Sequence, residues 1–261
     1  VYVFGDSFSH ADEVTDYQAW PNLVEKKIGC PVFNFGVSGY GTDQAYLALL
    51  QKLPKLTENT RKRPIVLFGI YQDMLKRNMA ASWLFYCCYN LKNSIKPFFT
   101  LNESRESLLL KKLPENYDIK SISNHHSSDR YYQLYRIDFP YTISLVRNLY
   151  YRINRDAFDR VIIEPYEFVY EDEDGSLIQF LIMQEIRKVI LERGYELGFI
   201  FFPTPHRALS QQPPYSLFLE RLPLYLKDDK HVFTIDTHRS LYKISRRLGE
   251  LAMPKGHFDA I

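Results

Sequence analysis

Short apolar runs alternate along the chain with stretches in which apolar residues recur every three or four positions. The short runs predict strands over residues 1–4, 31–35, 65–70, 196–202 and 232–235. The stretches with helical spacing predict helices over residues 20–28, 42–53, 177–193, 215–226 and 238–251, with Thr42 or Asp43 suited to cap the second of these. Strands that alternate with helices indicate an α/β fold, in which helices cover both faces of a mostly parallel sheet.

The regular alternation is interrupted over residues 79–170. Apolar runs at 96–100 and 107–111 flank a polar segment and predict a β-hairpin, and residues 141–154 have the spacing of an amphipathic helix. We interpret this region as an inserted cap. The expected architecture is therefore a single domain over residues 1–261, a three-layer α/β/α sandwich with a flavodoxin-like five-stranded sheet.

Composition and charge exclude several classes of protein. A hydrophobic fraction of 46% and a charged fraction of 25% are typical of globular domains, and a net charge of +2 implies no strong attraction to nucleic acid or anionic membranes. No apolar run reaches the roughly 18 residues that span a bilayer. Three cysteines without CxxC spacing, Cys30, Cys87 and Cys88, favour neither a disulfide framework nor a zinc site.

The start of the sequence bears on the location of the protein. No signal peptide is recognisable, which favours the cytoplasm. The chain opens at Val1 within the first expected strand and has no initiator Met, so we expect a trimmed chain from which a targeting segment could have been lost.

A candidate nucleophile follows the first predicted strand. Ser7 lies in the sequence Gly-Asp-Ser at residues 5–7. Ligands of open parallel sheets bind at the carboxyl ends of the strands, although Asp and Ser are also ordinary turn residues. Serine needs a base to accept its proton. Of the seven histidines, His257 and its rival His206 are expected at the same edge, whereas His10 is constrained by its proximity to Ser7 in the chain.

A glycine-rich loop at residues 36–41 follows the second predicted strand. Its backbone N–H groups suit an oxyanion hole, which needs donors aimed at the charge that develops in the transition state. A strand-to-helix turn without any ligand is the simpler alternative. Gln72, after the third predicted strand, offers a further amide donor.

These segments together resemble the SGNH or GDSL hydrolase superfamily, whose members share four sequence blocks in fixed order. Gly-Asp-Ser at residues 5–7 matches the nucleophile block, and Asn-Phe-Gly-Val-Ser-Gly at 34–39, with the following 40–44, matches the glycine block. Ile-Tyr-Gln-Asp at 70–73 stands where the family has Gly-x-Asn-Asp. Gly-His-Phe at 256–258 matches the block that contains the catalytic histidine.

The resemblance implies that Ser7 is the nucleophile and His257 the general base. It implies that the N–H groups of Ser7 and Gly39 hold the oxyanion, together with Gln72 in place of the family's asparagine. Further residues expected to line the site are Asp6, Tyr40, Asp73 and His206. No metal or organic cofactor is implied.

The chain departs from the family where the acid that orients the histidine is expected, because that position holds Pro254. A backbone carbonyl, Asp236 or Asp259 remain as alternatives for that role. Loss of the orienting acid costs serine hydrolases several orders of magnitude in rate, so a catalytically degenerate homologue is a further hypothesis.

The predicted function is hydrolysis of an acyl ester, such as an O-acetyl group on a carbohydrate, through an acyl-Ser7 intermediate. A sugar O-acyltransferase and a catalytically degenerate, glycan-binding protein are the alternatives. A phosphate-binding protein is disfavoured because no GxGxxG or GxxxxGK[ST] pattern is present. Aromatic residues make up 15% of the chain and either line a sugar-binding surface or pack the core. The sequence leaves the oligomeric state open.

Overall fold

The computed structural model describes residues 1–56, 63–71, 74–79, 96–112, 140–143, 145–146, 173–203, 216–226 and 229–248. The chain divides into two compact units. One unit comprises residues 1–74 and 179–261, and the other comprises residues 75–178.

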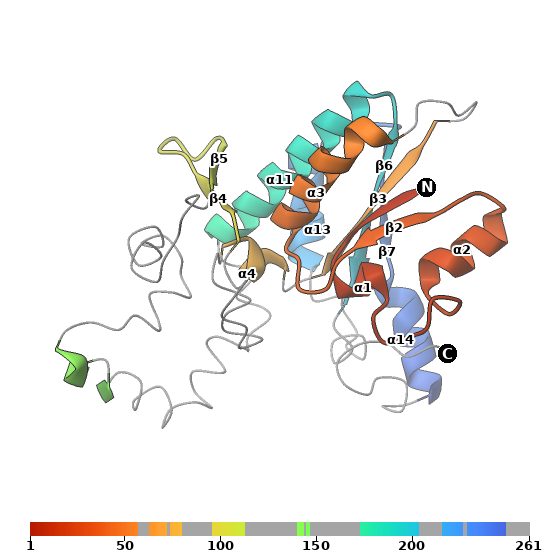
Figure 1. Cartoon of the computed structure of the whole chain (residues 1–261), viewed down its shortest axis with the longest axis horizontal. Coiled ribbons are helices and arrows are strands. Elements are labelled where there is room, and N and C mark those ends of the chain that lie inside the picture. The colour runs from red at the N-terminus through yellow and green to blue at the C-terminus, as the bar shows by residue number, and fades with distance from the viewer. Residues whose placement is uncertain are drawn as a thin grey trace. The chain divides into compact units, whose positions relative to one another are not determined.

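A five-stranded, entirely parallel sheet forms the centre of the first unit (Figure 1). The strand order is β2-β1-β3-β6-β7. The strands are β1 (Tyr2–Gly5), β2 (Phe33–Gly36), β3 (Ile65–Tyr71), β6 (Glu196–Phe202) and β7 (Val232–Asp236). Each lies within one or two residues of a predicted strand, so the α/β fold with a five-stranded parallel sheet is confirmed.

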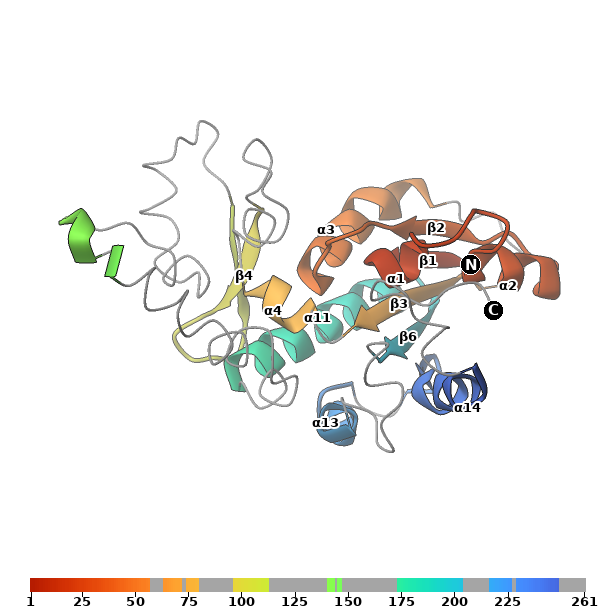
Figure 2. The ribbon, with the colours of Figure 1, turned by 90° about the horizontal axis from the view of Figure 1, so that it is seen from below.

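Helices cover both faces of the sheet, as the alternating sequence pattern predicts. Figures 1 and 2 show α2 and α14 on the side of the sheet opposite α3, α11 and α13. The helices of this layer arrangement are α2 (Trp20–Ile28), α3 (Thr42–Lys52), α11 (Glu173–Glu192), α13 (Ser216–Leu226) and α14 (His238–Leu248). A short 3₁₀ turn, η1 (Leu53–Lys55), continues α3.

Stacked aromatic rings fill the layer between the sheet and helices α3, α11 and α13. Phe4 and Phe68 are paired in adjacent strands, and their ring centroids lie 5.5 Å apart. Phe180 of α11 stacks on Phe218 of α13 with centroids 4.2 Å apart, and Phe218 also contacts Phe201 of β6. Successive side chains of a strand point to opposite faces of the sheet. The side chains on this face therefore build one core together with the three helices.

The alternate residues of the same strands build a second core on the other face. Val3, Leu67 and Ile200 form it with Phe8, and Trp20 and Val24 of α2 pack against this cluster. Strands that are buried on both faces read as nearly continuous apolar runs, and the three central strands, β1, β3 and β6, have this pattern.

Several boundaries differ from the predicted ones. The cap residue of α3 is Gly41 and not Thr42 or Asp43, because these two residues are already helical and fully buried. The Thr42 hydroxyl donates to Gln179 Oε1 at 2.8 Å and so does not cap its own helix. Helix α11 begins at Glu173, one turn before the predicted start. Two short helices were not predicted, α1 (Ser7–His10) and α4 (Met74–Asn78).

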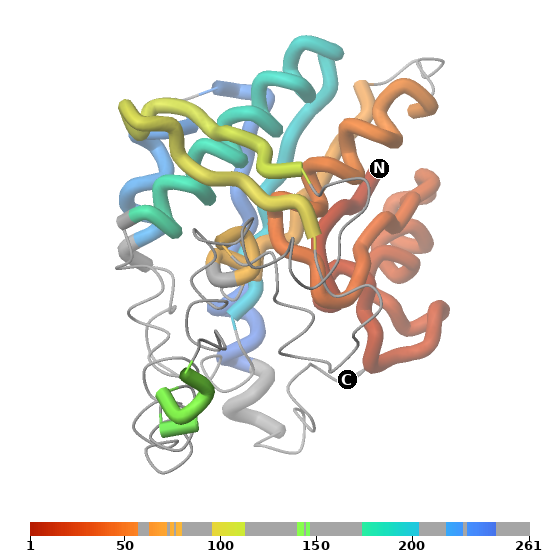
Figure 3. The backbone as a smooth tube through the Cα atoms, turned by 60° about the vertical axis from the view of Figure 1, so that its left-hand side comes forward, coloured from red at the N-terminus to blue at the C-terminus, as the bar shows by residue number. Residues whose placement is uncertain are grey.

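The second unit contains the predicted hairpin, formed by β4 (Phe98–Leu101) and β5 (Leu108–Lys111) and drawn in yellow in Figure 3. Asn102 organises its turn, since Asn102 Oδ1 accepts from the N–H groups of Glu106 and Ser107 at 2.9 and 3.1 Å. Most of the region predicted as a cap, including most of the helix expected over 141–154, lies outside the described residues.

No helix in the described ranges is both long and apolar enough to cross a membrane.

Candidate active site

Ser7 lies where the sheet changes its winding direction. The chain leaves β1 for β2 on one side and later enters β3 on the other side of β1. The carboxyl ends of β1 and β3 therefore form a topological switch point, the usual ligand site of open α/β sheets. Ser7 is the second residue after β1 and the first residue of α1, and only 6% of its surface is exposed.

Asp6 fixes the one-turn helix that begins at Ser7. Its carboxylate Oδ1 accepts the backbone N–H of Phe8 at 3.0 Å, and its carbonyl oxygen accepts the N–H of His10 at 2.9 Å. Asp6 is fully buried. An aspartate in this capping position contributes roughly 0.5–2 kcal/mol to a helix terminus.

Three glycines at or near the carboxyl ends of three strands, Gly5, Gly36 and Gly69, form the surface on which α1 packs. A Cβ atom at Gly36 would lie 2.5 Å from the backbone N of His10. A Cβ atom at Gly5 or Gly69 would lie 2.1 or 2.0 Å from Ser9 Oγ. All three distances are far shorter than ordinary Cβ contacts, so a side chain at any of these positions would force the Ser9 hydroxyl or the backbone of α1 to move.

Phe8 anchors α1 in the core beside Ser7. Its ring stacks on Tyr71 with centroids 4.3 Å apart and also contacts Phe202 at 5.8 Å. The Phe8 carbonyl oxygen accepts the indole N–H of Trp20 at 2.9 Å. These contacts hold the backbone on the C-terminal side of Ser7 against β3, β6 and α2.

The glycine-rich loop follows β2, the neighbour of β1. It is joined to β1 by the hydrogen bond from the Val37 N–H to the Gly5 carbonyl oxygen, 3.0 Å long. Gly39 has a φ of +79°, in the left-handed region that favours glycine. Within the described ranges, the N–H groups of Ser38 and Gly39 donate to no protein acceptor. They are therefore available to bind an acceptor from a ligand.

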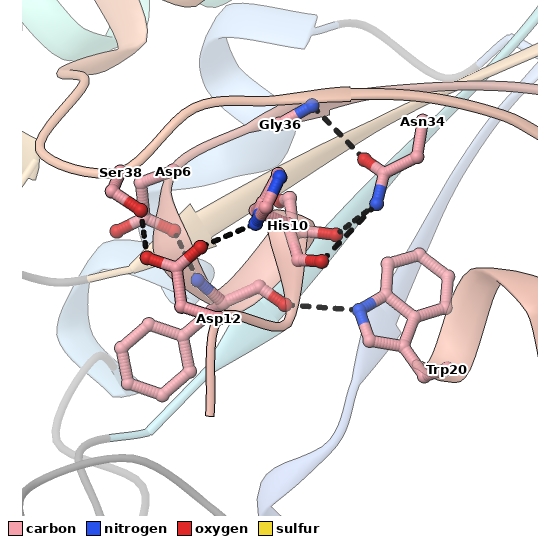
Figure 4. A network of polar contacts seen from close by, with 9 residues as sticks. Asp6, His10, Asp12, Trp20, Asn34, Gly36 and Ser38 are labelled. Carbon is pink, nitrogen blue, oxygen red and sulfur yellow. Dashed lines mark hydrogen bonds and ion pairs between the residues drawn. The ribbon is translucent and has the colours of Figure 1, made fainter. Parts of the chain in front are cut away.

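A network of side chains links this loop and β2 to α1 (Figure 4). Asp12 contacts His10 Nδ1 with one carboxylate oxygen and accepts the Ser38 hydroxyl with the other. Asn34 Nδ2 donates to the carbonyl oxygens of Ser9 and His10 at 3.0 and 3.3 Å, and Asn34 Oδ1 accepts the Gly36 N–H at 2.9 Å.

Sequence reasoning did not single out Asp12 as a site residue. The only feature of the local sequence that could have indicated Asp12 is that it is a polar residue a few positions after Ser7. Asn34 stood within the glycine block, yet its contacts with α1 join residues 24 and 25 positions apart and leave no trace in the local pattern.

The structure places four of the predicted site residues at one edge of the sheet. Asp6 and Ser7 follow β1, and Gly39 and Tyr40 lie in the loop after the adjacent β2. The remaining predicted residues, Gln72, Asp73, His206 and His257, lie outside the described residues, so the pairing of Ser7 with His257 stays a prediction.

Asp236 and Asp259 are the two carboxylates expected as alternative partners of His257. Asp236 is the last residue of β7, and its Oδ1 accepts the His238 N–H at the start of α14 at 2.9 Å. Asp259 lies outside the described residues. No three His, Cys, Asp or Glu side chains of the described ranges gather closely enough to hold a metal ion.

Comparisons of the chain with models of known protein families, with curated proteins and with solved structures found no match.

Proposed function

We propose that the protein is a serine esterase that acts through an acyl-Ser7 intermediate. The observation that carries the proposal is the position of Ser7 at the switch point of the sheet, next to a loop whose Gly39 N–H has no acceptor in the described part of the chain. A nucleophile and unpaired donors at one ligand-binding edge are the two elements that acyl transfer requires. The four sequence blocks that resemble those of SGNH hydrolases support the same chemistry.

In the proposed reaction, Ser7 Oγ attacks the acyl carbonyl carbon while its proton passes to His257. The N–H groups of Ser7 and Gly39, with the Gln72 amide, bind the oxygen that becomes negatively charged. The bond between the acyl carbon and the alcohol oxygen then breaks, and His257 returns the proton to the leaving alcohol. A water molecule, activated by His257, attacks the acyl carbon and releases Ser7 with the carboxylic acid.

We propose an O-acylated carbohydrate as the substrate class, with a short acyl group such as acetyl. The support comes from the sequence, since the predicted cap is rich in tyrosines, which stack on sugar rings. A sugar hydroxyl in place of water would make the same intermediate an acyltransferase intermediate. Product analysis with and without an added oligosaccharide acceptor distinguishes the two.

The esterase proposal is tested by labelling with a fluorophosphonate probe and by turnover of the ester p-nitrophenyl acetate. We expect labelling at Ser7 and a loss of at least about 10³-fold in kcat for Ser7→Ala and for His257→Ala, as for other serine hydrolases. Ser240→Ala, on the exposed surface of α14, and His231→Ala, before β7, are the matched controls and should retain activity.

Folded protein that is neither labelled nor active would contradict the proposal, as would activity that survives Ser7→Ala. The absence of a carboxylate three residues before His257, where Pro254 stands, favours a glycan-binding role in that event. Oligosaccharide binding that is unchanged in Ser7→Ala and His257→Ala, without hydrolysis, would then support the binding role.

A further inference from the structure

The tip of the glycine-rich loop, Ser38 and Gly39, is held by very few contacts. The loop base is fixed by the bond from the Val37 N–H to Gly5, and the Tyr40 N–H closes a turn onto the Val37 carbonyl at 3.1 Å. Among the described residues, the only hydrogen bond made by Ser38 or Gly39 is the one from the Ser38 hydroxyl to Asp12.

Asp12 reaches the loop because the chain reverses just after α1. Ala11 has φ and ψ angles of 66° and 52°, a left-handed conformation, and its N–H donates to the Ser7 carbonyl at 2.8 Å. The reversal brings the Asp12 carboxylate between His10, the last residue of α1, and Ser38, as Figure 4 shows. The carboxylate thus joins the element that carries Ser7 to the residue that precedes Gly39.

We propose that Asp12 is a positioning residue that sets the Gly39 N–H relative to Ser7. This inference rests on the proposed function. An oxyanion donor accelerates acyl transfer only if it is already in place when the charge develops, because its reorientation would cost part of the barrier that it lowers. The hydrogen bond from Ser38 to Asp12 supplies that fixation at the residue adjacent to the donor.

The arrangement also argues against Asp12 and His10 being a catalytic pair for Ser38. In a serine–histidine–aspartate triad the imidazole stands between the hydroxyl and the carboxylate. Here the carboxylate stands between the hydroxyl and the imidazole, so the His10 imidazole is not placed to accept the Ser38 proton. The Ser38 hydroxyl acts as a donor that holds the loop.

The test compares Asp12→Ala, Ser38→Ala and the double variant with the wild-type protein. We expect kcat on p-nitrophenyl acetate to fall by about 10–100-fold in each single variant with KM little changed, since the loss concerns an interaction made in the transition state. The double variant should be no slower than either single variant, because both remove the same bond. Asp16→Ala removes an exposed carboxylate that makes no hydrogen bond or ion pair with other described residues, and it is the matched control.

A second measurement is independent of activity. Hydrogen exchange of the Val37 and Tyr40 amides, whose hydrogen bonds close the loop, should become faster in Asp12→Ala and Ser38→Ala but not in Asp16→Ala. Unchanged exchange would overturn the inference even if Ser7 is the nucleophile, and so would losses of kcat that multiply in the double variant. Wild-type protein without esterase activity would instead overturn the proposed function, and with it the catalytic role of the contact, whatever the exchange rates show.

Discussion

At the scale of single residues, Ala11 occupies a conformation that its side chain disfavours. Its φ of 66° lies in the left-handed region, where an L-residue other than glycine, asparagine or aspartate is uncommon. Such a conformation costs on the order of 1 kcal/mol and persists only where the surroundings impose it. The hydrogen bonds of α1 and the contacts of Asp12 impose it here.

Replacement of Ala11 by glycine should therefore stabilise the protein. We expect Ala11→Gly to raise the free energy of unfolding by up to about 1 kcal/mol, since relief of strain exceeds the added freedom of the unfolded chain. The same change at Ala48, inside α3, should lower it by about 1 kcal/mol. Urea denaturation measures both, and a destabilising effect of Ala11→Gly would show that the left-handed turn carries no strain.

At the scale of elements, a helix of one turn is placed by its fit to the strand ends. Four residues are too few for a stable isolated helix, so α1 depends on its packing. Gly5 and Gly69 leave room for Ser9, whose hydroxyl donates to the Phe4 carbonyl at 3.4 Å. Gly36 leaves room for the backbone of His10.

This fit predicts a specific rescue between two substitutions. Gly69→Ala should cost roughly 1–3 kcal/mol through its clash with Ser9 Oγ. In the Ser9→Ala background that atom is absent and the nearest remaining contacts of the new Cβ are 3.0 and 3.4 Å, so the cost of Gly69→Ala should shrink by at least about 0.5 kcal/mol.

The matched comparison is Gly36→Ala, whose clash is with the backbone N of His10 at 2.5 Å. Ser9→Ala cannot relieve a backbone contact, so no rescue is expected there. Denaturation of the single and double variants gives both coupling energies. Equal coupling in the two pairs would argue against a clash with the Ser9 hydroxyl.

At the scale of the whole molecule, a second set of polar contacts lies at the amino ends of the strands, away from the edge that carries Ser7. Arg187 of α11 donates to Asp229 Oδ2 at 3.0 Å, and Asp229 Oδ1 accepts the His231 N–H at 2.9 Å just before β7. These contacts join the helical layer to an edge strand of the sheet.

The hydrogen bond from the His231 N–H, together with the positive charge of Arg187, lowers the pKa of Asp229 below its ordinary value. A lowered folded-state pKa adds stability above the unfolded pKa of about 4, and this stability is lost as the pH falls through the folded value. Asp229→Asn should therefore lower the thermal midpoint at pH 7, and the difference from wild type should shrink below pH 4.

Thermal unfolding at several pH values measures this effect. Asp16→Asn, at an exposed carboxylate without a hydrogen bond or ion pair to other described residues, should show no such dependence. A difference between Asp229→Asn and wild type that is constant from pH 7 to pH 3 would contradict the assignment.

Local sequence patterns were sufficient for the strands and the longer helices. Residues 65–71 and 197–202 contain no charged residue, because both faces of these strands are buried. Such short apolar runs are typical of central strands in a parallel sheet. Trp20–Ile28 has the bounds of the predicted helix, which ends at Gly29 in the left-handed conformation typical of a helix end. The predicted positions of Asp6, Ser7, Gly39 and Tyr40 at one edge follow from the parallel sheet alone.

Contacts between distant residues decided the rest. The packing of α1 on the sheet depends on Gly36 and Gly69, which come from different strands. Asp12 contacts Ser38 only because β2 lies beside β1. Helix α1 itself is too short for its sequence to specify. Propensity and periodicity act over a few residues, so they place Ser7 at the end of a strand. Only the folded sheet brings together the side chains that hold Ser7 and the Gly39 loop in place.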